Sequence, residues 1–187
     1  MDSQDLKDLA RAVIETEAKA VAGLSSRIDS AFVTACETIL GCRGRIVVLG
    51  MGKSGHIAGK LAATLASTGT PAFFVHAAEA SHGDLGMITT DDVVLILSNS
   101  GETDEVRQIL PVLKRLCHKI IAFTGKPSST LASHADIHIN VSVDAEACPL
   151  GLAPTSSTTA AMVMGDAMAV TLLKARGFTA EDFALSH

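Results

Sequence analysis

Short apolar runs alternate with longer helix-like segments between residues 45 and 176, and this alternation limits the fold more than any other feature of the chain. Five runs are predicted as strands, at 45–49, 72–75, 93–97, 119–123 and 137–141. The predicted helices lie at 54–68, 105–116, 128–133 and 156–176. Strands that are apolar at almost every position need cover on both faces, as in a buried parallel sheet. The sequence therefore predicts an α/β fold with a five-stranded parallel sheet between helices.

The first part of the chain is predicted to be helical. Leu6, Leu9 and Val13 follow helical spacing, and a second helix is expected before the first strand. We expect these N-terminal helices, within residues 1–44, to pack on the domain formed by residues 45–187. A length of 187 residues suits one domain with a buried core.

Charge and composition argue against several classes of function. The formal net charge is -5, and the chain has no Trp and no Tyr on which bases could stack, so we expect no nucleic-acid partner. The apolar runs are too short to cross a bilayer, and the polar N-terminus does not look like a signal peptide. The 4 cysteines form no Cys-x-x-Cys pair, which favours reduced thiols. We therefore expect a cytoplasmic protein with no membrane partner.

A glycine-rich turn, GMGKSGH at 50–56, comes directly after the first predicted strand. Glycines let backbone N–H groups approach an anion, and the helix that follows directs its positive end to the same place. The spacing matches neither a P-loop nor the dinucleotide fingerprint. The turn is a candidate cradle for a phosphate or a sugar, with Lys53 as its charged group. A plain glycine turn with a solvated lysine would give the same pattern.

A second polar cluster, SNSGET at 98–103, follows the third predicted strand. The hydroxyls of Ser98, Ser100 and Thr103 and the amide of Asn99 gather at the start of a helix, which is more than one N-cap requires. Neutral donors at a helix N-terminus bind a phosphate dianion well. Since ligands of open α/β sheets bind beyond the carboxyl ends of the strands, this cluster predicts a phosphate site.

Together these segments resemble the sugar isomerase (SIS) domain family, whose members have a flavodoxin-like five-stranded sheet and bind phosphosugars. Further blocks, at 67–87, 146–167 and 172–187, resemble the arabinose 5-phosphate isomerases of the Kdo pathway. The resemblance implies an aldose–ketose isomerase that interconverts D-arabinose 5-phosphate and D-ribulose 5-phosphate through an enediol and feeds Kdo and lipopolysaccharide synthesis. Many of these isomerases continue into a pair of CBS-type regulatory modules, and no such segment is expected in this sequence.

The resemblance also assigns roles to individual residues. As catalytic residues it implies Lys53, Glu105, Glu146 and His187. As substrate contacts it implies a phosphate shell of Ser54, Ser98, Ser100 and Thr103, with Asn99 beside them, and further contacts at Gly69, Thr70 and His82. It implies a zinc position at His76.

The chemistry of isomerisation allows these residues to be given tasks. The reaction needs a group that moves a carbon proton, a partner for the oxygen protons and a donor near the developing oxyanion. We assign Glu146 to the first task, His187 with His82 to the second and Lys53 to the third. Glu105 would orient Lys53 or share the proton transfer, although a carboxylate favoured by the helix dipole explains Glu105 equally well.

We expect no required cofactor, and an assembly of several subunits. Zinc is an alternative ligand, since His76, His82, Cys148 and His187 are suitable ligand types, but it would occupy the site rather than assist the reaction. The last predicted helix is rich in Ala and Met and would be about 30 Å long, which separates His187 from its own sheet edge. We therefore expect a homotetramer in which His187 reaches a neighbouring subunit.

Two alternatives to this function remain open. One is another phosphosugar isomerase, acting on a heptose or hexulose phosphate. The other is a phosphosugar-sensing regulatory SIS domain, which would keep the Ser/Thr shell without needing Lys53, Glu146 and His187 together. The joint presence of these three residues favours an enzyme.

Overall fold

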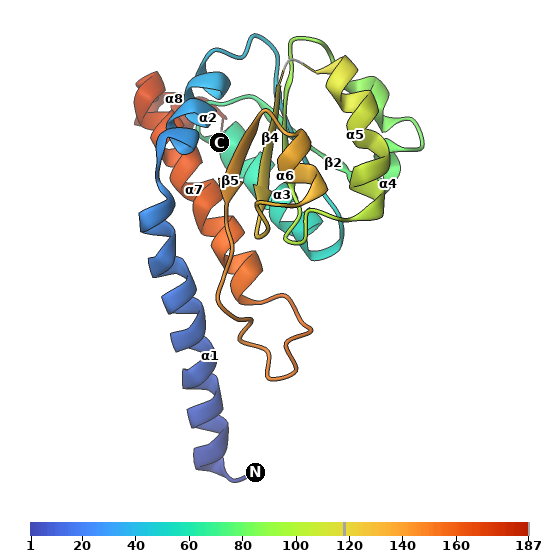
Figure 1. The fold of residues 1–187 in the computed structure, drawn as a ribbon. Coiled ribbons are helices and arrows are strands. Elements are labelled where there is room, and N and C mark those ends of the chain that lie inside the picture. The colour runs from blue at the N-terminus through green and yellow to red at the C-terminus, as the bar shows by residue number, and fades with distance from the viewer. Residues whose placement is uncertain (118, 187) are drawn as a thin grey trace.

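A single five-stranded sheet forms the middle of the molecule (Figure 1). The computed structural model describes residues 1–117 and 119–186. The strands are β1 (Ile46–Gly50), β2 (Ala72–His76), β3 (Val93–Leu97), β4 (Lys119–Thr124) and β5 (Ile137–Asn140). They are parallel and lie in the order β2-β1-β3-β4-β5. The predicted α/β fold is confirmed.

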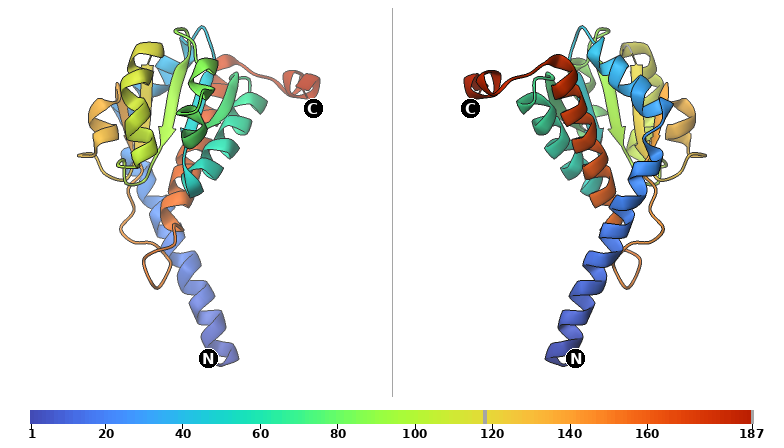
Figure 2. Two further views of the ribbon diagram at one scale, coloured as in Figure 1. Left: turned by 90° about the vertical axis from the view of Figure 1, so that its right-hand side faces the viewer. Right: turned by 90° about the vertical axis from the view of Figure 1, so that its left-hand side faces the viewer.

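Helices cover both faces of this sheet (Figure 2). The helices of seven residues or more are α1 (Ser3–Gly23), α2 (Ser30–Leu40), α3 (Gly52–Ser67), α5 (Asp104–Leu116), α7 (Ser156–Arg176) and α8 (Ala180–Ser186). The short ones are η1 (Leu24–Arg27), α4 (Ala77–Ala80), η2 (Asp84–Met87) and α6 (Thr130–His134). The helices α4 and η2, which form half of the connection between β2 and β3, were not predicted from the sequence.

The two faces of the sheet carry two separate hydrophobic clusters. Successive residues of a strand point to opposite faces. Val48 therefore packs into the cluster that α2, α3 and α7 contribute to, whereas Val47 and Leu49 pack into the cluster shared with α4, α5 and α6. All three side chains are fully buried. This double cover is the reason that the strands are apolar without alternation.

The helix α7 packs closely on α3 because it carries small residues at the contact. A Cβ atom on Gly165 would lie 2.9 Å from both methyl carbons of Leu61, so a larger residue would not fit without movement. The helix ends at Gly177, whose φ of 66° lies in the left-handed region that favours glycine. The predicted bounds of this helix, 156–176, are confirmed.

The helix α1 runs beside the start of α7 and then projects beyond the rest of the molecule (Figures 1 and 2). The Thr159 hydroxyl donates to the Glu17 carboxylate over 2.7 Å, which marks where the two helices meet. No residue of α1 is buried, and its Leu6, Leu9 and Ile14 side chains are exposed. Part of its apolar surface is thus without cover in the single chain.

Candidate functional site

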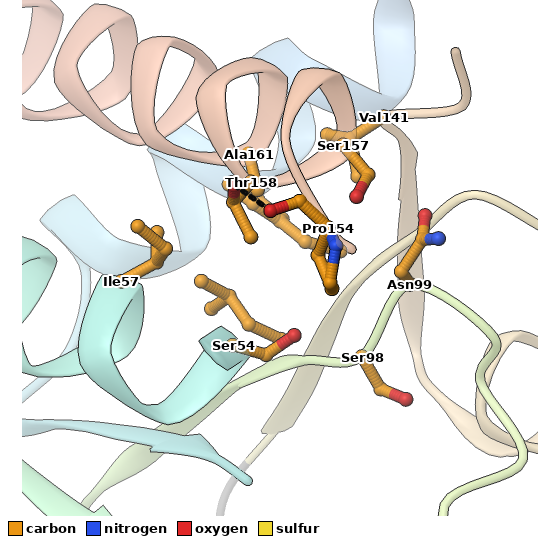
Figure 3. Close-up of a pocket in the computed structure, with 11 residues that line it drawn as sticks. Ser54, Ile57, Ser98, Asn99, Val141, Pro154, Ser157, Thr158 and Ala161 are labelled. Carbon is orange, nitrogen blue, oxygen red and sulfur yellow. Dashed lines mark hydrogen bonds between the residues drawn. The ribbon is translucent and has the colours of Figure 1, made fainter. Parts of the chain in front are cut away.

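A pocket opens at the edge of the sheet formed by the carboxyl ends of the strands, which we call the ligand edge. The pocket has a volume of about 380 Å³, open mouth included, and lies between the N-terminal turns of α3 and α7 (Figure 3). Its polar lining is Ser54, Ser98, Asn99, Ser157 and Thr158, and its apolar lining is Ile57, Leu97, Phe123, Val141, Pro154 and Ala161. Polar groups over an apolar floor suit a small polar ligand.

The glycine-rich turn brings Ser54 to this pocket. A Cβ atom on Gly50 would lie 2.7 Å from the Ser54 carbonyl oxygen, so only glycine lets the strand end approach the helix so closely. Gly52 has a φ of 55°, which also favours glycine. The N-cap of α3, Met51, makes no side-chain hydrogen bond to the helix. The positive end of α3 is therefore left for an anion.

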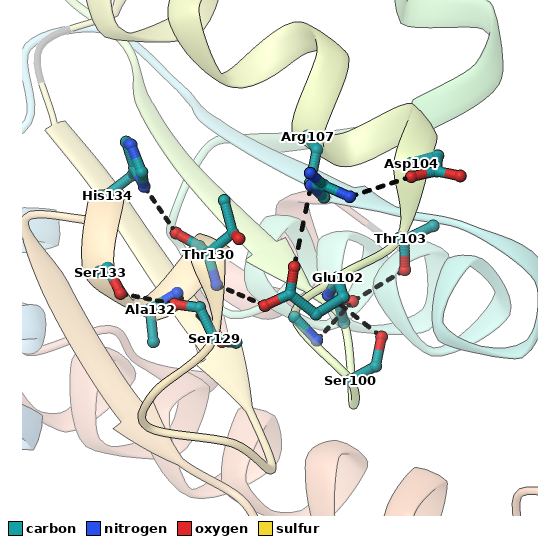
Figure 4. A network of polar contacts seen from close by, with 12 residues as sticks. Ser100, Glu102, Thr103, Asp104, Arg107, Ser129, Thr130, Ala132, Ser133 and His134 are labelled. Atoms are coloured by element: carbon teal, nitrogen blue, oxygen red, sulfur yellow. Dashed lines mark hydrogen bonds and ion pairs between the residues drawn. The ribbon is translucent and has the colours of Figure 1, made fainter.

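The polar cluster after β3 is held in shape by its own hydroxyls (Figure 4). The hydroxyls of Ser98 and Thr103 are hydrogen-bonded at 2.9 Å, and Ser98 also accepts a bond from the Gly101 N–H at 3.1 Å. The Ser100 hydroxyl accepts from the Glu102 N–H at 3.1 Å. Gly101 has a φ of 65°, and a Cβ atom there would lie 2.1 Å from the Ser129 hydroxyl oxygen. The turn can thus form only with glycine at this position.

Glu102, the acidic residue of this cluster, is not among the residues that line the pocket. Glu102 accepts a hydrogen bond from the Thr130 N–H at 2.7 Å and lies 3.8 Å from the Arg107 guanidinium. The Thr130 bond, aided by Arg107, lowers the pKa of Glu102 below its ordinary value. At the helix itself, the Thr103 N-cap of α5 makes no side-chain capping bond. A second helix N-terminus is therefore open at the ligand edge.

Glu146 closes the third helix N-terminus at this edge. Its Oε2 atom accepts bonds from the Thr155 N–H at 2.8 Å, the Thr155 hydroxyl at 3.0 Å and the Ser157 N–H at 3.2 Å. Partial burial opposes ionisation, but the donors of Ser157 and Thr155 outweigh it and lower the pKa of Glu146. The first backbone N–H groups of α7 are therefore bound by the Glu146 carboxylate, which is a side-chain cap that α3 and α5 lack.

Glu146 lies beside the pocket through its contact with the Ser157 N–H. Among the described residues that line the pocket, Glu146 does not occur, and its near neighbour Ser157 does. The carboxylate holds the start of α7 against the loop at 144–155. The assignment of Glu146 to carbon proton transfer stays a prediction. The structure shows that Glu146 also has a structural role as the cap of α7.

Most of the predicted site residues gather at the ligand edge. Ser54, Ser98 and Asn99 line the pocket. The other predicted residues at this edge do not line the pocket. Lys53 is exposed in the first turn of α3, and His76 ends β2 beside Gly55. Ser100 and Thr103 lie in the loop after β3, and Glu105 is half-buried in the first turn of α5. His82 is exposed on the connection that follows α4.

Two predicted contacts lie at the opposite end of the sheet. Gly69 and Thr70 precede the start of β2, and the Thr70 hydroxyl is buried and accepts a bond from Arg176 Nε at 3.1 Å. A Cβ atom on Gly69 would lie 2.4 Å from the Phe178 ring. Within one chain these residues cannot share a ligand with Ser98. His187 lies outside the described residues, and α8 before it starts from this same far end.

Ser157 and Thr158 line the pocket but were not predicted as site residues from the sequence. The signal was present, because four consecutive hydroxyl residues, Ser-Ser-Thr-Thr at 156–159, open the last predicted helix. One or two hydroxyls are ordinary at a helix start, and the pattern alone does not tell which of them faces a cavity.

A metal site and a membrane span are both without support in the described part of the chain. Residues 1–117 and 119–186 contain no group of three or more His, Cys, Asp and Glu side chains placed to bind a metal. Among those residues, His76 therefore belongs to no such group of three or more. No described helix combines the length and the apolar character that a membrane span requires.

Comparisons with known proteins agree with this architecture. Residues 39–171 match the family model described as "SIS domain". The chain is 60% identical over 183 residues to the arabinose 5-phosphate isomerase KdsD of Shigella flexneri, covering 98% of this chain and 56% of that protein. It is 62% identical over 178 residues to KdsD of Pseudomonas aeruginosa, covering 95% and 55%. The chain thus spans about half the length of these relatives.

A solved structure covers the whole chain. The E. coli CFT073 protein c3406, in complex with arabinose 5-phosphate, superposes with a TM-score of 0.96 at 46% identity, covering 100% of both chains.

Proposed function

The chain belongs to the SIS domain family, and we propose that it isomerises D-arabinose 5-phosphate and D-ribulose 5-phosphate through an enediol. Relatives with 60–62% identity are named arabinose 5-phosphate isomerases, and a similar structure holds arabinose 5-phosphate. In this proposal the enzyme is cytoplasmic and supplies Kdo and lipopolysaccharide synthesis. The matched relatives are about twice as long, and the proposal concerns the part that this chain represents.

The observation that carries the proposal is the contrast between three helix N-termini at one sheet edge. Those of α3 and α5 have no side-chain cap, and hydroxyls of Ser54 and Ser98 lie beside them in one pocket. The first turn of α5 carries Asp104 and Glu105, whereas that of α3 carries no acidic residue. The N-terminus of α7 is already neutralised by Glu146. An anion is therefore favoured at the α3 and α5 end, which is the expected place of the phosphate.

The proposed mechanism moves one proton between adjacent carbons. A base takes the proton from C2 of the open-chain aldose, and the enediol is protonated at C1 to give the ketose. Lys53 stabilises the negative charge that develops on the oxygens. Glu105 and Glu146 are the carboxylates available for carbon proton transfer, and His187 with His82 serves ring opening and the oxygen protons.

We further propose that the working unit is a homotetramer with shared sites. Three observations support association: Gly69 and Thr70 lie at the far end of the sheet, α8 starts from the same end, and α1 exposes Leu6, Leu9 and Ile14. If the far end of one subunit meets the ligand edge of another, all predicted contacts come together.

We propose that the enzyme requires no cofactor. Zinc, if it binds at His76, would inhibit the reaction and not assist it. Activity should survive treatment with EDTA. Added zinc should inhibit the wild-type protein more than a His76→Ala variant. Loss of activity with EDTA and recovery with zinc would contradict this part of the proposal.

The test of the function is an assay of this chain against a panel of pentose, hexose and heptose phosphates. Turnover should be fastest with D-arabinose 5-phosphate, measured as ketose formed. Preference for a heptose or hexulose phosphate would move the enzyme to a different substrate. Tight binding of a phosphosugar without turnover by a fully assembled protein would favour a sensor.

A further inference from the structure

Two serine hydroxyls at the start of α7 lack hydrogen-bond partners. Among the described residues, the buried side-chain atoms without a partner are the Oγ atoms of Ser156 and Ser157. Ser156 is 0% exposed and Ser157 is 3% exposed. A buried hydroxyl that bonds to nothing costs free energy, so each requires an explanation.

Only one of the two serines faces the pocket. Ser157 lines it together with Thr158 and Ser54, whereas Ser156 is not among its lining residues. In Figure 3 the Ser157 hydroxyl points from the first turn of α7 toward the side of the pocket where Asn99 lies. The cavity leaves room for a ligand atom that could form the hydrogen bond that the Ser157 hydroxyl lacks.

The surroundings of Ser157 select the kind of ligand atom. The Ser157 N–H bonds the Glu146 carboxylate at 3.2 Å, and the hydroxyl is near enough to favour ionised Glu146 without making a hydrogen bond of good geometry to it. This end of the pocket therefore already holds a negative charge. A second anion would be repelled here, whereas a neutral hydroxyl can both donate and accept.

The opposite wall has the reverse character. It is formed by Ser54 and Ser98, at the uncapped N-termini of α3 and α5. A phosphosugar is anionic at one end and neutral at the other, so it fits this pocket in one direction.

We propose that Ser157 is a substrate-binding residue whose hydroxyl bonds an oxygen of the sugar chain and not of the phosphate. The inference rests on the proposed function and adds the orientation of the substrate. The phosphate lies toward α3 and α5, and the carbon chain extends toward α7 and Glu146. Ser157 thereby selects ligands that carry a polyol chain beyond the phosphate.

The test compares Ser157→Ala with Ser156→Ala in the assembled protein. Both changes remove one buried hydroxyl from the same helix turn, and alanine keeps the N–H with which residue 157 bonds Glu146. Binding is measured by calorimetry with two probes, inorganic phosphate and D-arabinitol 5-phosphate, a reduced analogue that cannot isomerise. Kinetics with D-arabinose 5-phosphate give KM and kcat for each variant.

Ser157→Ala should bind D-arabinitol 5-phosphate about tenfold more weakly, equal to about 1.4 kcal/mol, and raise KM by a similar factor. Its affinity for inorganic phosphate should be unchanged. Ser156→Ala should match the wild type with both probes. If Ser157→Ala does not fold, Ser157→Cys should show the same selective loss, because a thiol is only slightly larger than a hydroxyl and forms weaker hydrogen bonds.

Three results would overturn the inference while leaving the proposed function in place. They are unchanged binding of D-arabinitol 5-phosphate by the Ser157 variant, an equal loss of both probes, or the same loss in Ser156→Ala. A wild-type protein that binds neither probe and does not turn over D-arabinose 5-phosphate would overturn the proposed function, and this inference with it.

Discussion

At the scale of single residues, hydroxyl groups at the ligand edge serve two different purposes. Ser98 and Thr103 bond each other and hold the loop after β3, so their hydroxyls are partly committed to the protein. The Ser157 hydroxyl makes no hydrogen bond of good geometry within the protein. A residue that shapes a loop and also touches a ligand loses both tasks on substitution, and experiments must separate the two.

The double substitution Ser98→Ala with Ser100→Ala should weaken phosphosugar binding by roughly 2–4 kcal/mol. In the proposed site each hydroxyl would bond the charged phosphate, and water would replace part of the energy lost. Calorimetry with D-arabinitol 5-phosphate measures the loss. Thr171→Ala is the control, since this exposed threonine bonds only the Ala167 carbonyl of its own helix. If the double variant binds as tightly as the control, Ser98 and Ser100 do not bind the phosphate.

Glu146→Gln should remove nearly all turnover and leave substrate binding largely intact, because glutamine keeps the size of the side chain and cannot accept a proton. The defect should appear in kcat. An active variant would assign the carbon proton to Glu105 or His187.

Glu146 should also contribute to the pH dependence of stability. Its folded-state pKa lies below the ordinary value of 4.5, so its stabilising contribution is complete above pH 4.5 and is lost as the pH falls through the lower, folded-state pKa. Glu146→Gln should lower stability at neutral pH by roughly 1 kcal/mol, as loss of a helix cap does. The unfolding temperature, measured between pH 3 and pH 7, should fall less with decreasing pH in the variant than in the wild type. If the unfolding temperatures of the wild type and the variant fall equally as the pH is lowered, Glu146 does not have this role.

At the scale of elements, α7 connects the core to the site. Its middle packs on α3 through Gly165, and its first turn carries both the Glu146 cap and Ser157. A change in the α3–α7 contact would therefore alter the pocket between the starts of these two helices. The spacing of the helices is set by side-chain volume, since protein interiors are close-packed.

Gly165→Ala should destabilise the fold by roughly 1 kcal/mol, because the cost of overpacking against Leu61 exceeds the gain in helix propensity. Gly59→Ala is the matched control. It lies inside α3, where a new Cβ atom would meet the Phe74 ring at an ordinary 3.8 Å, and it should stabilise by up to about 1 kcal/mol. Denaturant unfolding measures the change in unfolding free energy of each variant. A change of the same sign in both variants would refute the packing argument.

At the scale of the whole molecule, the single chain separates residues that the proposed reaction needs together. Lys53 lies at the ligand edge, whereas Gly69, Thr70 and the start of α8 lie at the far end. The exposed apolar side chains of α1 offer a surface on which a second copy would bury area. Sharing of sites between subunits reconciles these observations.

Mixtures of inactive Lys53→Ala and inactive His187→Ala subunits should regain part of the wild-type activity after reassembly. Some sites would then receive Lys53 and His187 intact from different chains. A mixture of Lys53→Ala with Glu146→Gln should not recover, because both residues belong to the same edge of one chain. No recovery after confirmed subunit exchange, or a fully active monomer in light scattering, would defeat the shared site.

Local sequence patterns were enough to establish the layers of this protein and the two loops of its ligand edge. Buried strands and covering helices follow from residue type and spacing along the chain, which are local properties. The turns at 50–56 and 98–103 were recognisable because strand, glycine and hydroxyl residues are adjacent in the chain.

Which hydroxyls face the pocket, and which carboxylate closes α7, depended on the tertiary structure. Ser156 and Ser157 are neighbours of one type, and their difference comes from the helix rotation that packing on α3 imposes. Glu146 reaches Thr155 across a loop, and Gly69 is placed far from Ser98 by the direction of β2. Contacts between distant parts of a chain depend on how its elements pack, and no local pattern records that packing.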